Sequence, residues 1–374
     1  MKTVLFLAAL LLSVQPAAWA RSEAELDRAA AGIERFDINA AGNRFKLLGD
    51  FEGTTIIFKV YDSSGATAGG LKLPSRYSNY RGEIAAYRIA RFLGVTIFPA
   101  TVPKSLDAAT AARLAAMLEA KEFRTDRDDH HKRAIETKEE NRRAALRMLR
   151  GEGGVEGCFK EWVENIQFVS QVGTRESLGG HPVMGYLKAD GPLPPEGAAR
   201  LKQCTSLMDE KGCFTGSIEW RRLARDISDM MLVDALSGNL DRFPGGNVHM
   251  RSLGGPGKKA KGGVYFPAVE LLALDNGATF MSPSPNNLDD LTGRSSPALR
   301  VERFAAGRYE RLLEMKALLD GDPDAAREKF FLRSFEDDRG RVVDMLEQLA
   351  ENVDAALAHM RANDRKHGPR VVLP

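Results

Sequence analysis

The fold is decided by LVDALSGNLDRFPGGNVHMRS, residues 232–252, and by VELLALDNGATF, residues 269–280. The first segment places Asp241 and Asn247 on one polar loop, and the second places Asp275 directly after an apolar strand. One such carboxylate can orient a hydroxyl nucleophile while the other holds a divalent cation against nucleotide phosphates. The pair is therefore typical of a phosphoryl-transfer site.

Either segment by itself also fits an ordinary turn, because Asn, Asp and Gly favour turns for reasons unrelated to catalysis. A phosphoryl-transfer site gains support only if a phosphate-binding lysine and its partner come earlier in the chain, in the order that kinases use.

Upstream, Lys72 lies between two apolar residues of a short expected strand, where a charged side chain needs a partner or water. Eleven positions later, Glu83 begins the helical segment EIAAYRIARFLG, which ends at Gly94 in a C-cap position. A strand lysine that meets a helix glutamate is how kinase-like folds orient the lysine toward phosphates. An exposed ion pair is the plain alternative and contributes at most about 1 kcal/mol.

Residues 44–73 alternate apolar and β-branched residues between glycines, which predicts an antiparallel hairpin or meander. Gly49, Gly53, Thr54 and Thr55 lie where a first turn can bring backbone N–H groups against phosphates. This signal is weak when it stands alone, because most glycine-containing hairpin turns bind nothing.

The remaining segments give a coarse organisation. We expect an N-terminal helix over residues 22–36, a charged helical insertion over 104–150, strands over 161–170 and 182–188, and a helix over 217–236. The Gly and Lys tract over 252–263 is expected to be a hairpin tip, and 293–366 to be packed amphipathic helices. Pro and Gly concentrate near residues 186–197, which predicts the boundary between an N-lobe, 21–190, and a C-lobe, 191–374.

The chain has 374 residues, of which 43% are hydrophobic and 28% charged, so its length predicts two domains or lobes. Its 53 basic and 51 acidic residues give a net charge of +2, and no global field favours nucleic acid as a partner.

Residues 1–20 combine Lys2, a short apolar run and the segment Ala18-Trp19-Ala20, which predicts a secretory signal peptide cleaved near Ala20. No later run of about 20 apolar residues predicts a transmembrane segment. We therefore expect an exported protein, secreted or periplasmic.

Export permits disulfides, and the chain has the three cysteines Cys158, Cys204 and Cys213. Cys204 and Cys213 flank a short polar loop, and a bridge there would contribute roughly 2 to 3 kcal/mol on the entropic model. Three unpaired buried thiols are the alternative.

The segments from FKLLGDFEGTTIIFKV through EIAAYRIARFLGV and PVMGYLKADGPLP to GNLDR and LDNG occur in one order over residues 44–280. In this order the chain resembles the secretory-pathway kinases typified by Golgi casein kinase and Four-jointed, and is more distantly similar to phosphatidylinositol kinases and HipA toxin kinases. The resemblance implies an α+β, bilobal atypical kinase fold, with a small antiparallel-sheet N-lobe and a mainly helical C-lobe.

By resemblance, Lys72 is the phosphate-binding lysine, Glu83 its helix partner, Asp241 the catalytic aspartate, and Asp275 a metal ligand, with Asn247 as a second one. ATP is the implied cofactor, together with Mg²⁺ or Mn²⁺. The physical reason for the cation is repulsion: two carboxylates about 4 Å from phosphate oxygens would each repel them by roughly 4 kcal/mol at an effective dielectric near 20. The expected acceptor is a hydroxyl of a protein Ser or Thr, a lipid or a glycan.

Two departures from the family's pattern keep a second function open. Asn247 comes six residues after Asp241, where kinases commonly space the asparagine by five, and Ser78-Asn79-Tyr80 stand where the secretory kinases have a further acidic residue. A nucleotide-binding pseudokinase, acting as a regulatory or binding module, is therefore the alternative hypothesis.

Overall fold

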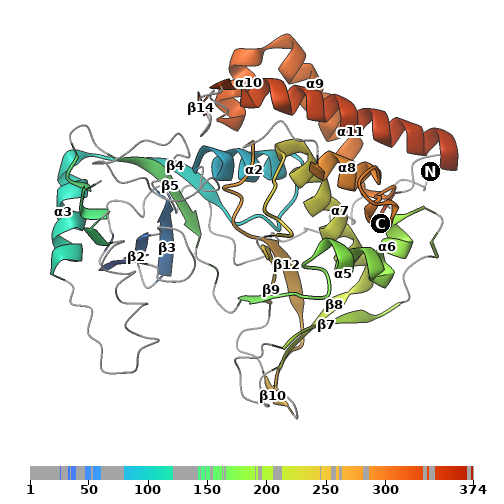
Figure 1. Cartoon of the computed structure of the whole chain (residues 1–374), viewed down its shortest axis with the longest axis horizontal. Helices are drawn as coiled ribbons and strands as arrows, with labels where there is room; N and C mark the ends of the chain where they lie inside the picture. Colours follow the sequence, from blue (N-terminus) through green and yellow to red (C-terminus); the bar gives the residue numbers. More distant parts are fainter. Residues whose placement is uncertain are drawn as a thin grey trace, which may run out of the picture.

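The protein has two lobes in a computed structural model, which Figure 1 shows. The structure describes residues 26, 33, 35–38, 47–51, 54–59, 80–120, 142–143, 145–147, 149–151, 155–161, 163, 166–189, 191–192, 196–204, 213–244, 246–253, 258–260, 263–280, 286–331, 335–336, 342–368 and 372–373. Every structural statement below concerns these residues.

A five-stranded antiparallel sheet forms the N-lobe, with the strand order β1-β2-β3-β5-β4. Its strands are β1 (Arg35–Ile38), β2 (Leu47–Phe51), β3 (Thr54–Lys59), β4 (Thr101–Leu106) and β5 (Val155–Glu161). The hairpin predicted from alternation is confirmed in β2 and β3, which pair from Leu47 with Phe58 to Phe51 with Thr54.

Helix α2 (Tyr80–Phe92) crosses this lobe and packs against β4, β5 and the C-lobe helix α7. Its apolar positions, such as Ile84 and Ile89, are fully buried, as the sequence pattern requires. The helix ends as predicted at Gly94, whose φ of 76° lies in the left-handed region that glycine adopts without strain. A second helix, α3 (Ala108–Glu119), begins at the N-cap Asp107.

Helix α7 (Trp220–Ser237) is the central element of the C-lobe, and all its residues from Asp226 to Ser237 are buried. The other helices around it (Figure 1) are α5 (Arg175–Gly180), α6 (Pro182–Leu187), α8 (Asn286–Thr292), η3 (Pro297–Leu299), α9 (Arg308–Gly321), α10 (Pro323–Phe330) and α11 (Met345–His367). Of these, α6, α8 and α11 pack directly against α7, and the others pack on these three or on one another.

Smaller sheets accompany these helices. One has the order β12-β9-β6 and a second the order β10-β11-β8-β7, and β13 pairs with β16 and β14 with β15. The strands are β6 (Ile166–Phe168), β7 (Ala198–Cys204), β8 (Cys213–Glu219), β9 (Val248–Ser252), β10 (Lys258–Ala260), β11 (Gly263–Phe266), β12 (Val269–Ala273), β13 (Phe304–Ala305), β14 (Phe335–Glu336), β15 (Val342–Val343) and β16 (Val372–Leu373).

One predicted strand is wrong. Pro182–Leu187 forms helix α6, because the proline occupies the first turn, where a missing N–H costs nothing, and His181 caps it. The His181 ring nitrogen Nδ1 accepts a hydrogen bond from the Val183 amide at 3.3 Å. The short apolar run PVMGYL was therefore ambiguous between strand and buried helix.

The structure also refines the limits of several predicted elements. Residues 35–36, expected in the N-terminal helix, belong to strand β1. The insertion expected to be helical from residue 104 begins as the end of β4 and then forms α3. Strand β5 ends the five-stranded sheet at residue 161, and β6, which begins at residue 166, already pairs with β9 of another sheet. The predicted lobe boundary near residue 190 stays a prediction.

Some predictions lie outside the described residues. These are the signal peptide over residues 1–20, and Gly53, Lys72 and Ser78-Asn79. The hairpin register places the backbones of Cys204 and Cys213 directly opposite each other, whereas their disulfide stays a prediction. None of the helices in the described part of the chain combines the length and apolarity that crossing a bilayer needs.

Asp226 should make the stability of the C-lobe depend on pH. Burial raises the pKa of its carboxyl from 3.8 to about 7, against the lowering effect of Arg222 and Arg225. Because the folded protein binds this proton more tightly, its contribution is complete below pH 4 and is lost as pH rises through 7. We expect Asp226→Asn to flatten this part of the profile. Relative to wild type, the free energy of unfolding of the variant should therefore increase by up to about 4 kcal/mol between acid pH and pH 8.

Urea unfolding at pH 5, 6, 7 and 8 checks this expectation through the difference between variant and wild type. Asp320→Asn, on the exposed face of α9, is the control and should change nothing. Parallel profiles for Asp226→Asn and wild type would show that Asp226 stays ionised in the fold.

Candidate functional site

The loop that follows α7 carries Asp241. Helix α7 ends at Gly238 in the left-handed conformation, with φ of 63°, and this reverses the chain. The side-chain oxygen of Asn239 then accepts a hydrogen bond from the Asp241 amide at 3.0 Å. A buried Asn287 donates to the carbonyls of Asp234 and Asn239 and holds the start of the loop against α8. The predicted polar turn is thus fixed by side chains as well as by its backbone.

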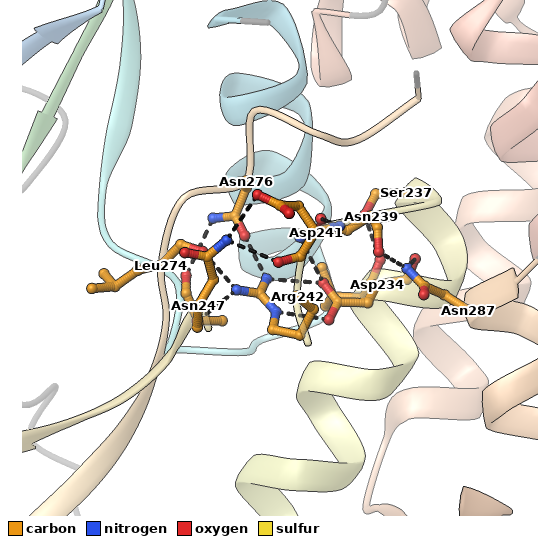
Figure 2. Close-up of polar contacts among 11 residues, drawn as sticks. Asp234, Ser237, Asn239, Asp241, Arg242, Asn247, Leu274, Asn276 and Asn287 are labelled. Carbon is orange, nitrogen blue, oxygen red and sulfur yellow. Dashed lines mark hydrogen bonds and ion pairs between the residues drawn. The ribbon is translucent and has the colours of Figure 1, made fainter. Parts of the chain in front are cut away.

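Arg242 lies at the centre of the site and is only 1% exposed (Figure 2). Its guanidinium forms a two-pronged ion pair with Asp234 of α7, with N–O distances of 2.8 and 2.9 Å. It also donates to the carbonyls of Asn247, at 3.0 Å, and Leu274, at 2.6 Å, and to the side-chain oxygen of Asn276 at 2.5 Å. All five N–H groups of an arginine are therefore used.

Burial raises the pKa of the Asp234 carboxyl, and the guanidinium of Arg242 and the amide of Asn239 oppose that shift. A carboxylate in this position is stable only while those donors stay in place. Asp234 is therefore a support of the loop, as the sequence predicts from its place at the end of the buried helix face.

Asp241 is half-buried and faces Asn247 (Figure 2). The Asn247 amide donates to the Asp241 carbonyl at 2.9 Å and to its carboxylate oxygen Oδ2 at 3.3 Å. The structure thus brings together the predicted catalytic aspartate and the predicted second metal ligand. Since the amide nitrogen orients Asp241, the Asn247 amide oxygen is the atom that remains for a cation.

Asp275 lies on the neighbouring loop, immediately after strand β12, and is half-buried with a positive φ of 52°. The two residues beside it, Leu274 and Asn276, both accept hydrogen bonds from Arg242. The Leu274 amide also donates to the Asn247 carbonyl at 3.1 Å. One buried guanidinium therefore joins the Asp241 loop to the Asp275 loop.

Glu83 of α2 is fully buried and pairs with Lys160 of β5, with an N–O distance of 2.8 Å. The predicted partner Lys72 lies outside the described residues, so the pair of Lys72 and Glu83 stays a prediction. Sequence reasoning missed Lys160. Its signal resembled that of Lys72, a lysine that follows apolar residues of a strand, here Cys158 and Phe159 of VEGCFKE.

The candidate phosphate-binding turn lies between β2 and β3. Gly49 is within β2, where it pairs with Phe36 and Ile56, and so lies before the turn rather than in it. Thr54 and Thr55 begin β3 directly after the turn. Contact of these residues with phosphates stays a prediction.

Comparisons with known proteins bear on the fold. No family model matches the chain, and no curated protein matches it in sequence. Solved structures do match it, among them the Golgi casein kinase, with a TM-score of 0.52 and 14% identity over 94% of this chain and 78% of that one. The Golgi casein kinase with Mn and ADP bound matches with a TM-score of 0.53 and 13% identity, over 94% and 79% of the two chains.

This chain has the fold of the Golgi casein kinase. The α+β bilobal architecture predicted from the sequence is therefore confirmed, and the predicted resemblance is confirmed at the level of fold. At 13 to 14% identity the match concerns the fold alone, and the roles of individual residues rest on the contacts described above.

We expect the Arg242 network to be the most sensitive point of the C-lobe to mutation. Arg242→Met leaves the buried Asp234 carboxylate without its charged partner and removes a donor from the carbonyls of Asn247 and Leu274, which should cost about 3 to 5 kcal/mol in free energy of unfolding. Adding Asp234→Leu to this variant removes the unpaired charge and should restore part of the loss.

Urea denaturation of both variants measures these changes. Arg294→Met is the matched control, since Arg294 pairs with Asp289 on the exposed surface and should cost less than about 1 kcal/mol. An Arg242→Met protein as stable as this control would mean that the guanidinium does not hold the loops together.

Proposed function

We propose that the protein is an exported, ATP-dependent kinase that transfers the γ-phosphoryl group to a hydroxyl acceptor. The observation that carries the proposal is the buried network of Arg242, which holds the Asp241 and Asp275 loops side by side. The fold, shared with a Golgi casein kinase that binds Mn and ADP, supports the same conclusion. Among hydroxyl acceptors, a protein Ser or Thr is the first choice, and lipid and glycan hydroxyls are the others.

The chemistry of the ligand atoms fits a hard divalent cation. Carboxylates and an amide oxygen are the ligands that Mg²⁺ and Mn²⁺ prefer, and Asp275 and Asn247 would supply them. In the described part of the chain no three His, Cys, Asp or Glu residues cluster as a metal cage. A protein that provides few ligands and leaves the others to phosphate and water is how Mg²⁺ commonly binds with nucleotides.

In the proposed mechanism, Asp241 accepts the hydrogen bond of the acceptor hydroxyl, orients its oxygen and receives its proton. Asn247 keeps the carboxylate in that orientation through its amide. When bound, ATP supplies the γ-phosphoryl group: the acceptor oxygen forms a bond to phosphorus, and the bond between phosphorus and the β–γ bridging oxygen breaks. Asp275 would hold the cation, and Lys72, which the resemblance pairs with Glu83, would contact the phosphate oxygens.

A nucleotide-binding pseudokinase is the second candidate, and one observation favours it. The Glu83 carboxylate, which the kinase mechanism assigns to Lys72, is fully buried and bonded to a different lysine, Lys160. The missing acidic residue at Ser78-Asn79 points in the same direction. In this alternative the site binds nucleotide and transfers nothing.

Asp241→Asn decides between these functions, because the amide keeps the shape of the carboxylate and cannot take the proton. We expect turnover to fall by a factor of about 10² to 10⁴, with the affinity for a fluorescent ADP analogue in Mn²⁺ within threefold of wild type. The assay measures metal-dependent ATP consumption and phosphate transfer with protein, lipid and glycan acceptors. Asp320→Asn, remote on α9, should behave as wild type.

Transfer that survives Asp241→Asn would refute the role of Asp241. Binding of the ADP analogue by wild type without transfer to any acceptor would support the pseudokinase instead.

Asp275→Asn tests the metal ligand separately. Removing one negative charge next to the cation should weaken Mn²⁺-dependent binding of the ADP analogue by at least about tenfold, since one charge-assisted contact contributes about 1.5 kcal/mol or more. Titration of Mn²⁺ at a fixed concentration of the analogue measures this shift. Equal Mn²⁺ dependence in variant and wild type would exclude Asp275 as the ligand.

A further inference from the structure

Arg308, the first residue of α9, connects the two helices that lead to the candidate site. Its Nε and Nη2 form a two-pronged ion pair with Asp229 of α7, both at 2.8 Å. Its Nη1 donates to the carbonyl of Leu93 at 2.5 Å, and its Nη2 to that of Gly94 at 3.4 Å. One side chain, only 12% exposed, therefore contacts both the C-terminal end of α2 and the middle of α7.

The position of Arg308 is explained by these contacts and not by its own helix. A cation at a helix N-terminus meets the positive end of the helix dipole, which is unfavourable, whereas a cation at a helix C-terminus is stabilised. The Arg308 guanidinium leaves the first turn of α9 and reaches the last carbonyls of α2, where the dipole favours it. Asp229 then neutralises its charge within the core.

Gly94 makes this approach possible. Its φ of 76° turns the chain so that the carbonyls of Leu93 and Gly94 face the guanidinium, and a Cβ at this position would lie 3.3 Å from Arg308 Nη1. A side chain at residue 94 would therefore crowd the guanidinium as well as strain the backbone.

The two helices carry opposite halves of the candidate site. Helix α2 bears Glu83 in its first turn, and α7 ends at the loop of Asp241. Glu83 and its partner Lys160 hold the N-terminal end of α2 against β5. Arg88 ties a later turn of the helix to α10, and Arg308 joins its last carbonyls to Asp229 of α7.

We infer that Arg308 is a positioning residue, which sets the place of Glu83 relative to Asp241 by fixing the C-terminal end of α2 to α7. The predicted effect of Arg308 on turnover rests on the proposed function, whereas its predicted effect on α2 rests on the contacts alone. The inference assigns to a residue 225 positions after Glu83, outside the motifs of the site, control over the geometry of the candidate site.

Arg308→Lys tests the inference in the full-length protein. Lysine keeps the charge and loses the fork that binds Asp229 and the two carbonyls together. We expect amide hydrogen exchange over residues 84–94 to accelerate by at least about tenfold, the equivalent of one or two lost hydrogen bonds. Exchange at the end of α7, over residues 230–237, should change by less than threefold.

Lys316→Ala is the matched control, because Lys316 lies on the same helix and pairs with Asp320 of α9 and Asp354 of α11. It should leave exchange in α2 as in wild type. Unchanged exchange in Arg308→Lys, or equal acceleration in Lys316→Ala, would overturn the inference.

Turnover separates positioning from simple stability. In Arg308→Lys we expect kcat to fall by about tenfold with KM for the acceptor within threefold, at a temperature where both proteins are fully folded. A loosened α2 with unchanged kcat would overturn the positioning role. A wild-type protein that binds nucleotide and transfers nothing would refute the proposed function, and the exchange of α2 would still decide on Arg308.

Discussion

The ion pair between Arg242 and Asp234 is the interaction on which the rest of the site depends. Removing two charges from water is costly, and a buried pair is stable only when every remaining donor and acceptor is satisfied. Here the guanidinium uses all its N–H groups, on α7, on the Asp241 loop and on the Asp275 loop. Phe98, between α2 and β4, covers its face at 5.5 Å from the ring centre. The buried ion pair thereby fixes the geometry of two loops that strands and helices alone would not position.

A second series of buried ion pairs connects the N-lobe sheet to helix α7. Arg251 of β9 contacts Glu270 of β12 and, at 3.7 Å, Glu161 at the end of β5. Arg222 of α7 pairs with the same Glu270 and lies 3.8 Å from Asp226. Charges of alternating sign thus run from the last strand of the N-lobe to the central helix of the C-lobe. Because ion pairs are directional and apolar packing is not, such a line selects one arrangement of the sheets over neighbouring ones.

The sequence predicted what depends on local pattern. Alternation located the β2–β3 hairpin, helical periodicity and a left-handed glycine located α2 and its end, and the turn residues around Asp241 and Asp275 located the two loops of the site. It failed where the pattern was short, as at Pro182–Leu187, since six apolar residues satisfy a strand and a buried helix equally. It also could not identify the partners of buried charges. Lys160 follows Glu83 by 77 residues, and only the fold brings them together.

Arg242 shows that the sequence also cannot tell which residues of one motif react and which support them. The sequence GNLDR marks the aspartate as the residue with chemistry and gives no reason to prefer its neighbour. The neighbour is the more buried of the two and makes the contacts that hold both loops. A motif therefore records which residue types occur together, while their division into reacting and supporting groups follows from burial and hydrogen bonding.

Helix α2 links the N-lobe to the C-lobe. This helix belongs to the N-lobe in sequence, but Arg88 donates to the Glu328 carbonyl of α10 at 3.0 Å, and the carbonyl end of α2 accepts from Arg308 of α9. Segments more than 200 residues later thus complete its surroundings. The unpaired carbonyls at the end of a helix must be satisfied by groups that the fold brings to them, and here those groups come from distant segments. The last quarter of the chain, which carries no motif, therefore takes part in placing the helix that bears Glu83.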